Sequence, residues 1–343
     1  MENFKPADSS IQKIINKEGG LPSFSAYKHF ADLFRTQEFT DASFREILSR
    51  ELPKNEKENG FISFFSRYTD ELRTKHQIPP LVVEPKHVHV LPAKDLESAS
   101  EALTQAFYVY NRQAIFIREG FNIIEFSHKV NHEMLHFKGF NSVEVLPNGM
   151  LSPKQIGVSV YDHNEKTLLH ENLNEAMTEI LNMRMIKRLF QEKNLAENIK
   201  KSYKDLEQIK ENLGLSENKK GETFKILEPS EEDVYFFNKD TYEPLTYAYP
   251  DQRKAVLSLI ETIAKKQPPD SEISDKEKVW EIFEKAYMTG DLLPLEKILD
   301  ESFGVGTFRK LGMVDRLSTG EKSDKNKADK NLGAFTSFIY SLT

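Results

Sequence analysis

The sequence predicts an α+β protein in which a small mixed sheet is flanked by mainly helical regions at both ends of the chain. The stretch PPLVVEPKHVHVLP (79–92) is rich in β-branched residues and bounded by prolines, which indicates a strand or two, and RQAIFIREG (112–120) is a second strand candidate. On both sides of them, apolar residues recur at helical spacing, as in SAYKHFADLFRTQ (25–37). The sheet should therefore lie in the middle of the chain, between helical segments.

Residues 1–78 are expected to form a helical N-terminal accessory region. Three stretches support this prediction: SSIQKIINKEGG (9–20), which ends in a double glycine, SAYKHFADLFRTQ (25–37) and DASFREILSRELP (41–53). Each carries apolar residues three and four positions apart, which places them on one face of a helix.

Residues 79–190 are expected to form the α+β core. The two strands lead into a helix from about Ser127 to Phe137, which should stop near Gly139 because glycine suits a left-handed helix end. A further strand is expected in QIGVSVYD (155–162), followed by a helix in LNEAMTEILNMRMIKRLFQ (173–191).

The rest of the chain is expected to be helical and highly charged. Residues 191–232 are interpreted as a charged helical insertion in contact with solvent, in preference to a partner-binding arm. Residues 233–315 should form a helical subdomain, with Pro250 in the first turn of a helix that runs to about Lys266 and more helix over 274–299. Residues 316–343 contain STGEKSDKNKADKN (318–331), whose low hydrophobicity predicts a mobile tail.

Composition excludes several classes of function. The net charge of -7 and the lack of a long basic run argue against nucleic-acid binding. The first twenty residues lack the positive start and apolar centre of a signal peptide, and no apolar run is long enough to span a membrane, so we expect a soluble, cytoplasmic protein with no membrane partner. With 0 cysteines, any transition-metal site must use His, Asp and Glu.

The stretch FSHKVNHEMLHFKGF (126–140) contains the strongest chemical signal. His132 and His136 are four residues apart, so on a helix both imidazoles face the same way and can bind one ion. Glu133 lies about 100° around the helix and can take a proton from a water on that ion, which is the role of a general base. The alternative interpretation is an amphipathic helix that happens to carry two histidines.

A catalytic zinc site uses three protein ligands, and LNEAMTEIL (173–181) offers the third. Glu175 and Glu179 are one helical turn apart and share a face of a helix that is otherwise apolar. Two carboxylates directed into a core require compensation, which a cation and a histidine would supply.

HEMLH followed by NEAMTE resembles the gluzincin metallopeptidases, the thermolysin-like branch of the zincins. The resemblance implies a zincin-like catalytic core over 79–190, with Zn²⁺ bound by His132, His136 and Glu175 and with Glu133 as the base. It also implies that Glu179 holds His132 through the other ring nitrogen without touching the metal. The matching stretch runs from Ala114 to Leu189, under a quarter of the chain. Its two motifs are further apart than in thermolysin itself and closer to the spacing of compact gluzincins.

Three features of such a site stay open in the sequence. Tyr249 is our choice for the residue that stabilises the oxyanion, although an ordinary packing role is the alternative, and the other candidates are Tyr161, His163, His170 and Tyr247. His128 is expected to be structural or to support a ligand rather than to be a fourth ligand, and His87 and His89 are expected to face solvent. The strand AIFIREG (114–120) would be either an edge strand that pairs with substrate or an interior strand.

The sequence thus predicts a zinc-dependent metallopeptidase that acts on a peptide or protein substrate. Two alternatives remain. One is a hydrolase that uses the same zinc apparatus on a non-peptide bond, and the other is a catalytically silent metal-binding or interaction protein.

Overall fold

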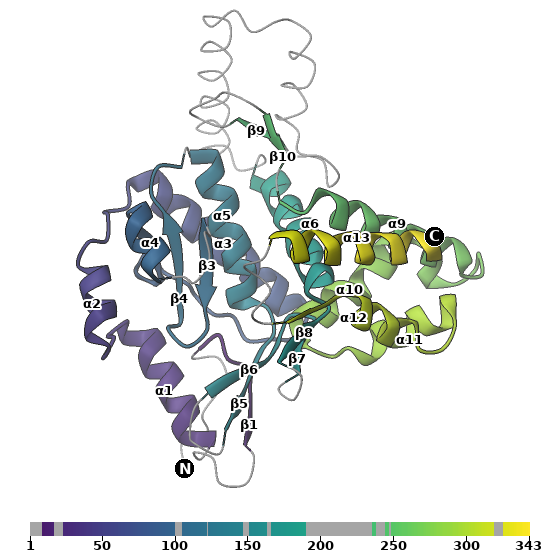
Figure 1. Ribbon diagram of the computed structural model, residues 1–343, viewed down its shortest axis with the longest axis horizontal. Coiled ribbons are helices and arrows are strands. Elements are labelled where there is room, and N and C mark those ends of the chain that lie inside the picture. The colour runs from purple at the N-terminus through teal and green to yellow at the C-terminus, as the bar shows by residue number, and fades with distance from the viewer. Residues whose placement is uncertain are drawn as a thin grey trace, which may run out of the picture.

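The structure, a computed structural model, describes residues 9–16, 23–99, 105–121, 123–146, 151–162, 166–189, 235–237, 244–246, 248–318 and 325–343. Two helices, α5 (Ile123–Lys138) and α6 (Glu171–Leu189), lie side by side in the centre of the molecule (Figure 1). A small sheet lies on one side of this pair and a group of C-terminal helices on the other. The predicted α+β class is confirmed.

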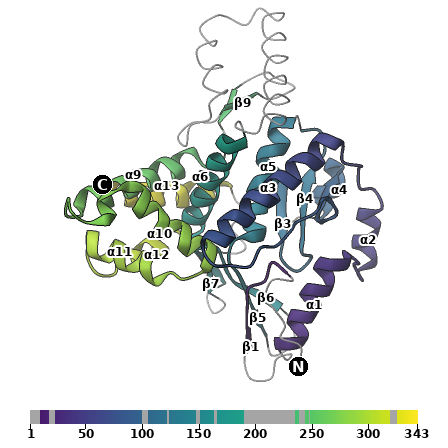
Figure 2. The ribbon, with the colours of Figure 1, turned by 180° about the vertical axis from the view of Figure 1, so that it is seen from behind.

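A three-stranded mixed sheet packs against α5. Its order is β2 (Val88–Leu91), β4 (Ala114–Arg118), β3 (Ala106–Val109), with β2 parallel and β3 antiparallel to β4. The 3-10 turn η2 (Pro85–His87) leads into β2, and α4 (Ala93–Ala99) follows it. Helix α3 (Glu56–Lys75) runs alongside α5 (Figure 2), after α1 (Ser23–Thr36) and α2 (Ala42–Leu48).

A second, six-stranded sheet lies near the end of α5. Its order is β1 (Lys13–Asn16), β5 (Asn141–Val145), β6 (Leu151–Ile156), β7 (Ser159–Asp162), β8 (Thr167–Leu169), β11 (Arg316–Ser318). β1 is parallel to β5, and the remaining pairs are antiparallel. The sheet therefore joins the first and last parts of the chain through β1 and β11.

The C-terminal helices lie on the side of α6 away from the small sheet. They are α9 (Pro250–Lys266), α10 (Lys276–Thr289), α11 (Leu293–Phe303), α12 (Thr307–Val314) and α13 (Lys325–Leu342), with the 3-10 turn η4 (Glu272–Ser274) before α10. Helices α9 and α10 pack on α6, and the other three pack on these and on one another. A short hairpin of β9 (Tyr235–Phe237) and β10 (Pro244–Thr246) precedes them.

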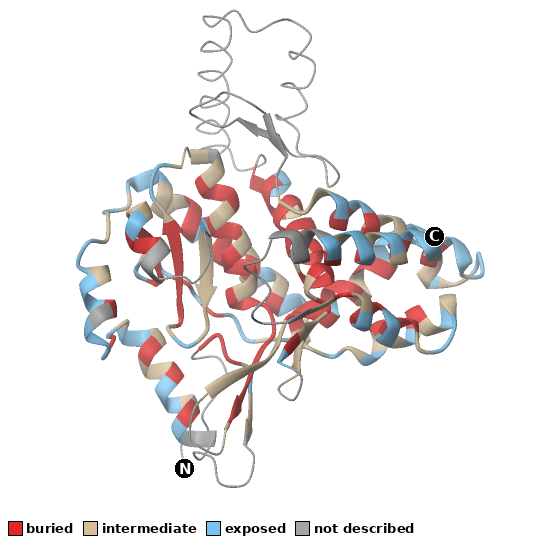
Figure 3. Ribbon diagram, viewed as in Figure 1, coloured by how far each residue is buried: buried red, intermediate tan, exposed pale blue. Residues whose placement is uncertain are grey.

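The main apolar core of the described residues connects α3, α5 and α6 with the C-terminal helices. It extends from Phe65 of α3 through Val130 of α5 and Ile180 of α6 to Trp280 of α10, and all four side chains are buried. Figure 3 shows buried positions concentrated on α5 and α6. Because both helices are held in the core on several sides, residues that they present to each other are fixed in position.

The helix predicted over 9–20 is wrong, because Lys13–Asn16 is the strand β1. Its backbone pairs in register with Ser142–Val145 of β5, and its short apolar run fits a strand as well as a helix. QIGVSVYD is the turn of a hairpin and not one strand. The chain reverses between β6 and β7 at Gly157, whose φ of +56° favours glycine.

The prediction of a mobile tail over 316–343 is wrong for most of the described residues of this range, which form a strand and a helix. Arg316–Ser318 pairs with β8, and α13 buries Phe335 and Ile339. These apolar side chains follow the charged stretch and hold the helix on the protein. The charged insertion predicted over 191–232 lies outside the described residues.

His87 and His89 are buried, contrary to the prediction that they face solvent. His87 stacks on Phe34 of α1 with 4.2 Å between ring centroids, and His89 lies 2.8 Å from the Glu51 carboxylate. The N-terminal helical segment therefore covers this part of β2. Within the described residues, we find no helix that combines the length and apolar character needed to cross a membrane.

Candidate metal centre

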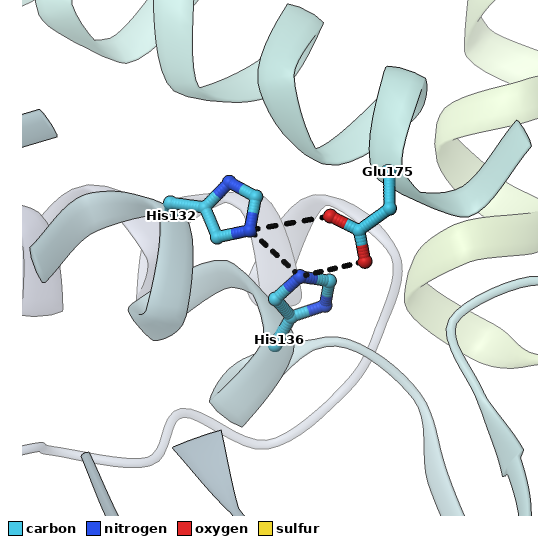
Figure 4. A group of neighbouring side chains, drawn as sticks. All are labelled: His132, His136 and Glu175. Atoms are coloured by element: carbon cyan, nitrogen blue, oxygen red, sulfur yellow. Dashed lines mark hydrogen bonds and ion pairs between the residues drawn. The ribbon is translucent and has the colours of Figure 1, made fainter. Parts of the chain in front are cut away.

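His132, His136 and Glu175 come together between α5 and α6 (Figure 4). The two histidines project from successive turns of α5, and Glu175 projects toward them from the first part of α6. One ligand atom from each residue lies within 4.8 Å of the others. The structure thus brings together the three residues that the sequence predicts as metal ligands.

The spacing of the ligand atoms fits a tetrahedral ion. Nε2 of His132 is 3.0 Å from Nε2 of His136 and 3.3 Å from Oε2 of Glu175, and Nε2 of His136 is 3.5 Å from Oε1 of Glu175. Ligand atoms about 2.0–2.1 Å from a tetrahedral zinc ion lie roughly 3.3–3.4 Å apart. The carboxylate faces each histidine with a different oxygen, and these separations are close enough to that spacing for one cation to bind both nitrogens and the carboxylate.

Glu179 lies on the opposite side of the His132 ring. Its Oε1 is hydrogen-bonded to Nδ1 of His132, and its side chain is 0% exposed. An ionised carboxylate can only accept, so Nδ1 is the donor in this contact and Nε2 is the nitrogen that faces the cluster. The predicted supporting position of Glu179 agrees with this geometry.

The charges of the cluster favour a cation. Burial opposes a charged imidazole, yet the carboxylates of Glu179 and Glu175 outweigh burial and raise the pKa of His132. Burial would raise the pKa of Glu175, but His136 and His132 beside it lower that pKa well below its usual range. Glu175 is therefore available as a carboxylate ligand at neutral pH.

Glu133 is directed to the same site. It is 7% exposed, and its Oε1 lies 3.9 Å from Nε2 of His132. It lines a pocket of about 260 Å³ beside the cluster. The pocket is lined by Gln105, Ala106, Lys129, His132, Glu133, Glu179, Ala248 and Tyr249. The Glu133 carboxylate therefore lies close to His132 and faces the pocket beside it.

Tyr249 is the oxyanion candidate that lies at the pocket. It precedes the first residue of α9 with φ of 61°, and its ring stacks on His132 with 6.3 Å between centroids. Glu175 and the partial burial of the phenol raise the pKa of Tyr249 well above 10. The hydroxyl therefore stays protonated at neutral pH and can donate a hydrogen bond.

The other oxyanion candidates do not share this position. Tyr161 lies on β7, and His170 is buried against Phe308 with 4.3 Å between ring centroids; neither lines the pocket. His163 and Tyr247 lie outside the described residues. His128 is buried on α5 but is not part of the cluster of His132, His136 and Glu175.

The strand AIFIREG is the interior strand of its sheet, because β4 pairs with β2 on one side and β3 on the other. β3 is at the edge of this three-stranded sheet. Gln105 and Ala106, at the start of β3, line the pocket. The sheet edge nearest to the cluster therefore belongs to β3, and the alternative that β4 is the edge strand is wrong.

Several hydrogen bonds fix the helix that carries Glu175. The Asp315 carboxylate accepts from the backbone N–H groups of Asn172 and Leu173, both at 3.1 Å, and so caps the start of α6. Asn174 Oδ1 accepts from the Val158 N–H at 3.0 Å. The start of α6 is thereby tied to α12 and to the β6–β7 turn.

Sequence reasoning missed two buried amides behind the cluster. Asn131 precedes His132 on α5, and Asn182 lies one turn after Glu179 on α6; both side chains are 0% exposed. The signal was present for Asn182, because it continues the face of Glu175 and Glu179 by one helical turn.

No protein-family model, curated protein or solved structure gives a significant match to this chain.

Proposed function

We propose that this protein is a zinc-dependent metallopeptidase of the gluzincin kind, in which Glu133 activates the hydrolytic water. The observation that supports this most strongly is the ligand triangle of His132, His136 and Glu175, with Glu133 beside it. Three protein ligands leave one coordination position open, as a catalytic zinc site requires. When bound, zinc would polarise the substrate carbonyl and lower the pKa of a bound water.

The residues around the cluster support definite roles in peptide hydrolysis. Glu133 would accept the proton of the attacking water and pass it to the amine as the C–N bond breaks. The Tyr249 hydroxyl would donate a hydrogen bond to the oxygen that becomes negatively charged. Glu179 would keep His132 in the tautomer that presents Nε2.

The edge strand β3 favours a peptide over a non-peptide substrate. Gln105 and Ala106 at its start line the pocket, and an extended peptide can add to a sheet edge through main-chain hydrogen bonds. A substrate without a peptide main chain could not form these hydrogen bonds with the edge strand. A catalytically silent metal-binding protein would have no use for a carboxylate held beside the open side of the cluster.

The experiment is a peptide-library digest of the zinc-loaded wild type beside Glu133→Gln. Glu133→Gln should keep zinc and fold but lose turnover by about 10²–10⁴-fold, because the amide cannot accept the proton. Glu261→Gln, a carboxylate-to-amide change on the exposed surface of α9, is the matched control and should cleave like the wild type. Equal turnover by Glu133→Gln, or a wild type that binds zinc and cleaves no peptide, would contradict the proposal.

A further inference from the structure

Asn182 connects the supporting carboxylate to the helix that carries the histidines. Its Nδ2 lies 3.4 Å from Oε2 of Glu179 and donates to the backbone carbonyl of His128 at 3.2 Å. Its Oδ1 accepts from Nδ2 of Asn131 at 2.6 Å. All of these contacts are buried.

The neighbours determine which way the Asn182 amide points. The Glu179 carboxylate and the His128 carbonyl can only accept, so the NH₂ group must face them. The oxygen then faces the NH₂ group of Asn131. Every member of this network has one compatible orientation.

The network acts on both oxygens of Glu179. One oxygen is hydrogen-bonded to Nδ1 of His132, and the other faces Asn182. A buried carboxylate held at both oxygens cannot rotate away from the imidazole without losing a donor. Asn131 precedes His132 in the chain. The network therefore links α5 to α6 twice, through Asn131–Asn182 and through His132–Glu179.

We propose that Asn182 is a positioning residue for the metal centre: through Glu179 it fixes the His132 ring so that Nε2 points at the metal. This inference rests on the proposed zinc site. A purely structural contact between the two helices would require only that Asn182 and Glu179 touch. The proposed role requires in addition that Asn182 donates and Glu179 accepts.

Asn182→Asp tests that polarity with almost no change of shape. The new carboxylate can still accept from Asn131, but it places an oxygen against Oε2 of Glu179. Zinc should bind about 10–100-fold more weakly, as expected when support for a ligand is lost.

The double variant Asn182→Asp/Glu179→Gln restores the polarity of the contact between these two side chains in reverse, while the lost donor to the His128 carbonyl is common to Asn182→Asp and the double variant. Nε2 of the new glutamine can donate to the new aspartate, while its Oε1 still accepts from Nδ1 of His132. In Glu179→Gln alone, the glutamine NH₂ group would instead meet the Asn182 NH₂ group. The double variant should therefore bind zinc about 10-fold more tightly than either single variant, a coupling that a double-mutant cycle measures.

Leu181→Ala is the control for an effect on stability alone. Leu181 is a buried apolar residue of α6 next to Asn182. Its truncation should lower the unfolding midpoint of the metal-free protein but leave the zinc Kd within about threefold of wild type, since it is not part of the network.

The experiment is a chelator-buffered zinc titration of wild type, the two single variants, the double variant and Leu181→Ala, with thermal unfolding of each metal-free form. Recovery of zinc affinity in the double variant supports the proposal. Additive losses, an unchanged Kd in Asn182→Asp, or an equal loss in Leu181→Ala would overturn it. If Asn182→Asp alone does not fold, the zinc Kd of the double variant is compared with that of Glu179→Gln: tighter binding by the double variant supports the proposal, and equal or weaker binding overturns it. A wild type that binds no zinc would overturn the proposed function as well, whereas wild-type binding without coupling would overturn only the role of Asn182.

Discussion

Glu179 is hydrogen-bonded to Nδ1 of His132, and this contact decides which nitrogen of the ring faces Glu175. The two carboxylates of α6 thus meet opposite sides of one imidazole. Because Glu175 and Glu179 are the same residue type in different positions, the same substitution at each should affect zinc binding differently.

Glu175→Gln should bind zinc poorly even at high metal concentration, because it removes a charged ligand. Glu179→Gln can still accept from Nδ1 of His132, so it should weaken zinc binding by only about 10–100-fold. A chelator-buffered zinc series compares the two directly. Equal zinc affinities of the two variants would show that Glu179 either is a ligand itself or does not contribute to zinc binding.

Tyr249→Phe should lower kcat by about 10²–10³-fold, the usual cost of losing one oxyanion donor. Zinc content and the unfolding midpoint should stay at the wild-type values, because the ring that stacks on His132 is kept. The measurement is steady-state cleavage of a peptide identified in the library digest. Tyr161→Phe, at a tyrosine that does not line the pocket, is the control; full activity in Tyr249→Phe would assign the oxyanion role elsewhere.

His170 should make the fold sensitive to acid. Burial lowers the pKa of His170 from 6.5 to about 4, so the folded state resists protonation that the unfolded state accepts. The resulting stability is present above pH 6.5 and is lost as the pH falls toward 4. Between pH 7 and pH 5, the free energy of unfolding of His170→Asn should therefore fall by about 2 kcal/mol less than that of the wild type.

Urea unfolding at the two pH values tests this prediction. Asparagine is chosen because His170 has φ of +62°, a conformation that asparagine tolerates. The control is His29→Asn on the exposed side of α1, which should follow the wild-type profile. Parallel profiles for wild type and His170→Asn would contradict the assignment of acid sensitivity to His170.

The residues of the candidate metal centre could be predicted because their arrangement is local. Residues four apart on a helix share a face, so the pairs His132/His136 and Glu175/Glu179 follow from helical geometry once the helices are recognised. The family resemblance implied that the two helices meet at these faces, and His132, His136 and Glu175 do lie together between α5 and α6.

The features that sequence reasoning missed or left open depend on distant partners. β1 is a strand because Ser142–Val145 lies beside it, and β4 is interior because β3 pairs with its other edge. Neither relationship is encoded in the local pattern. The roles of Asn131 and Asn182 likewise depend on the contact between α5 and α6.

The most direct test of the central claim is the zinc content of purified wild type and Glu175→Ala after gel filtration, measured by elemental analysis. We predict close to one zinc per chain in the wild type and almost none in Glu175→Ala, while Glu261→Ala, at an exposed glutamate, keeps the wild-type content. A Glu175→Ala protein that retains its zinc while Glu179→Ala loses it would contradict the assignment of the third ligand, and a wild type without affinity for zinc would contradict the metal centre itself.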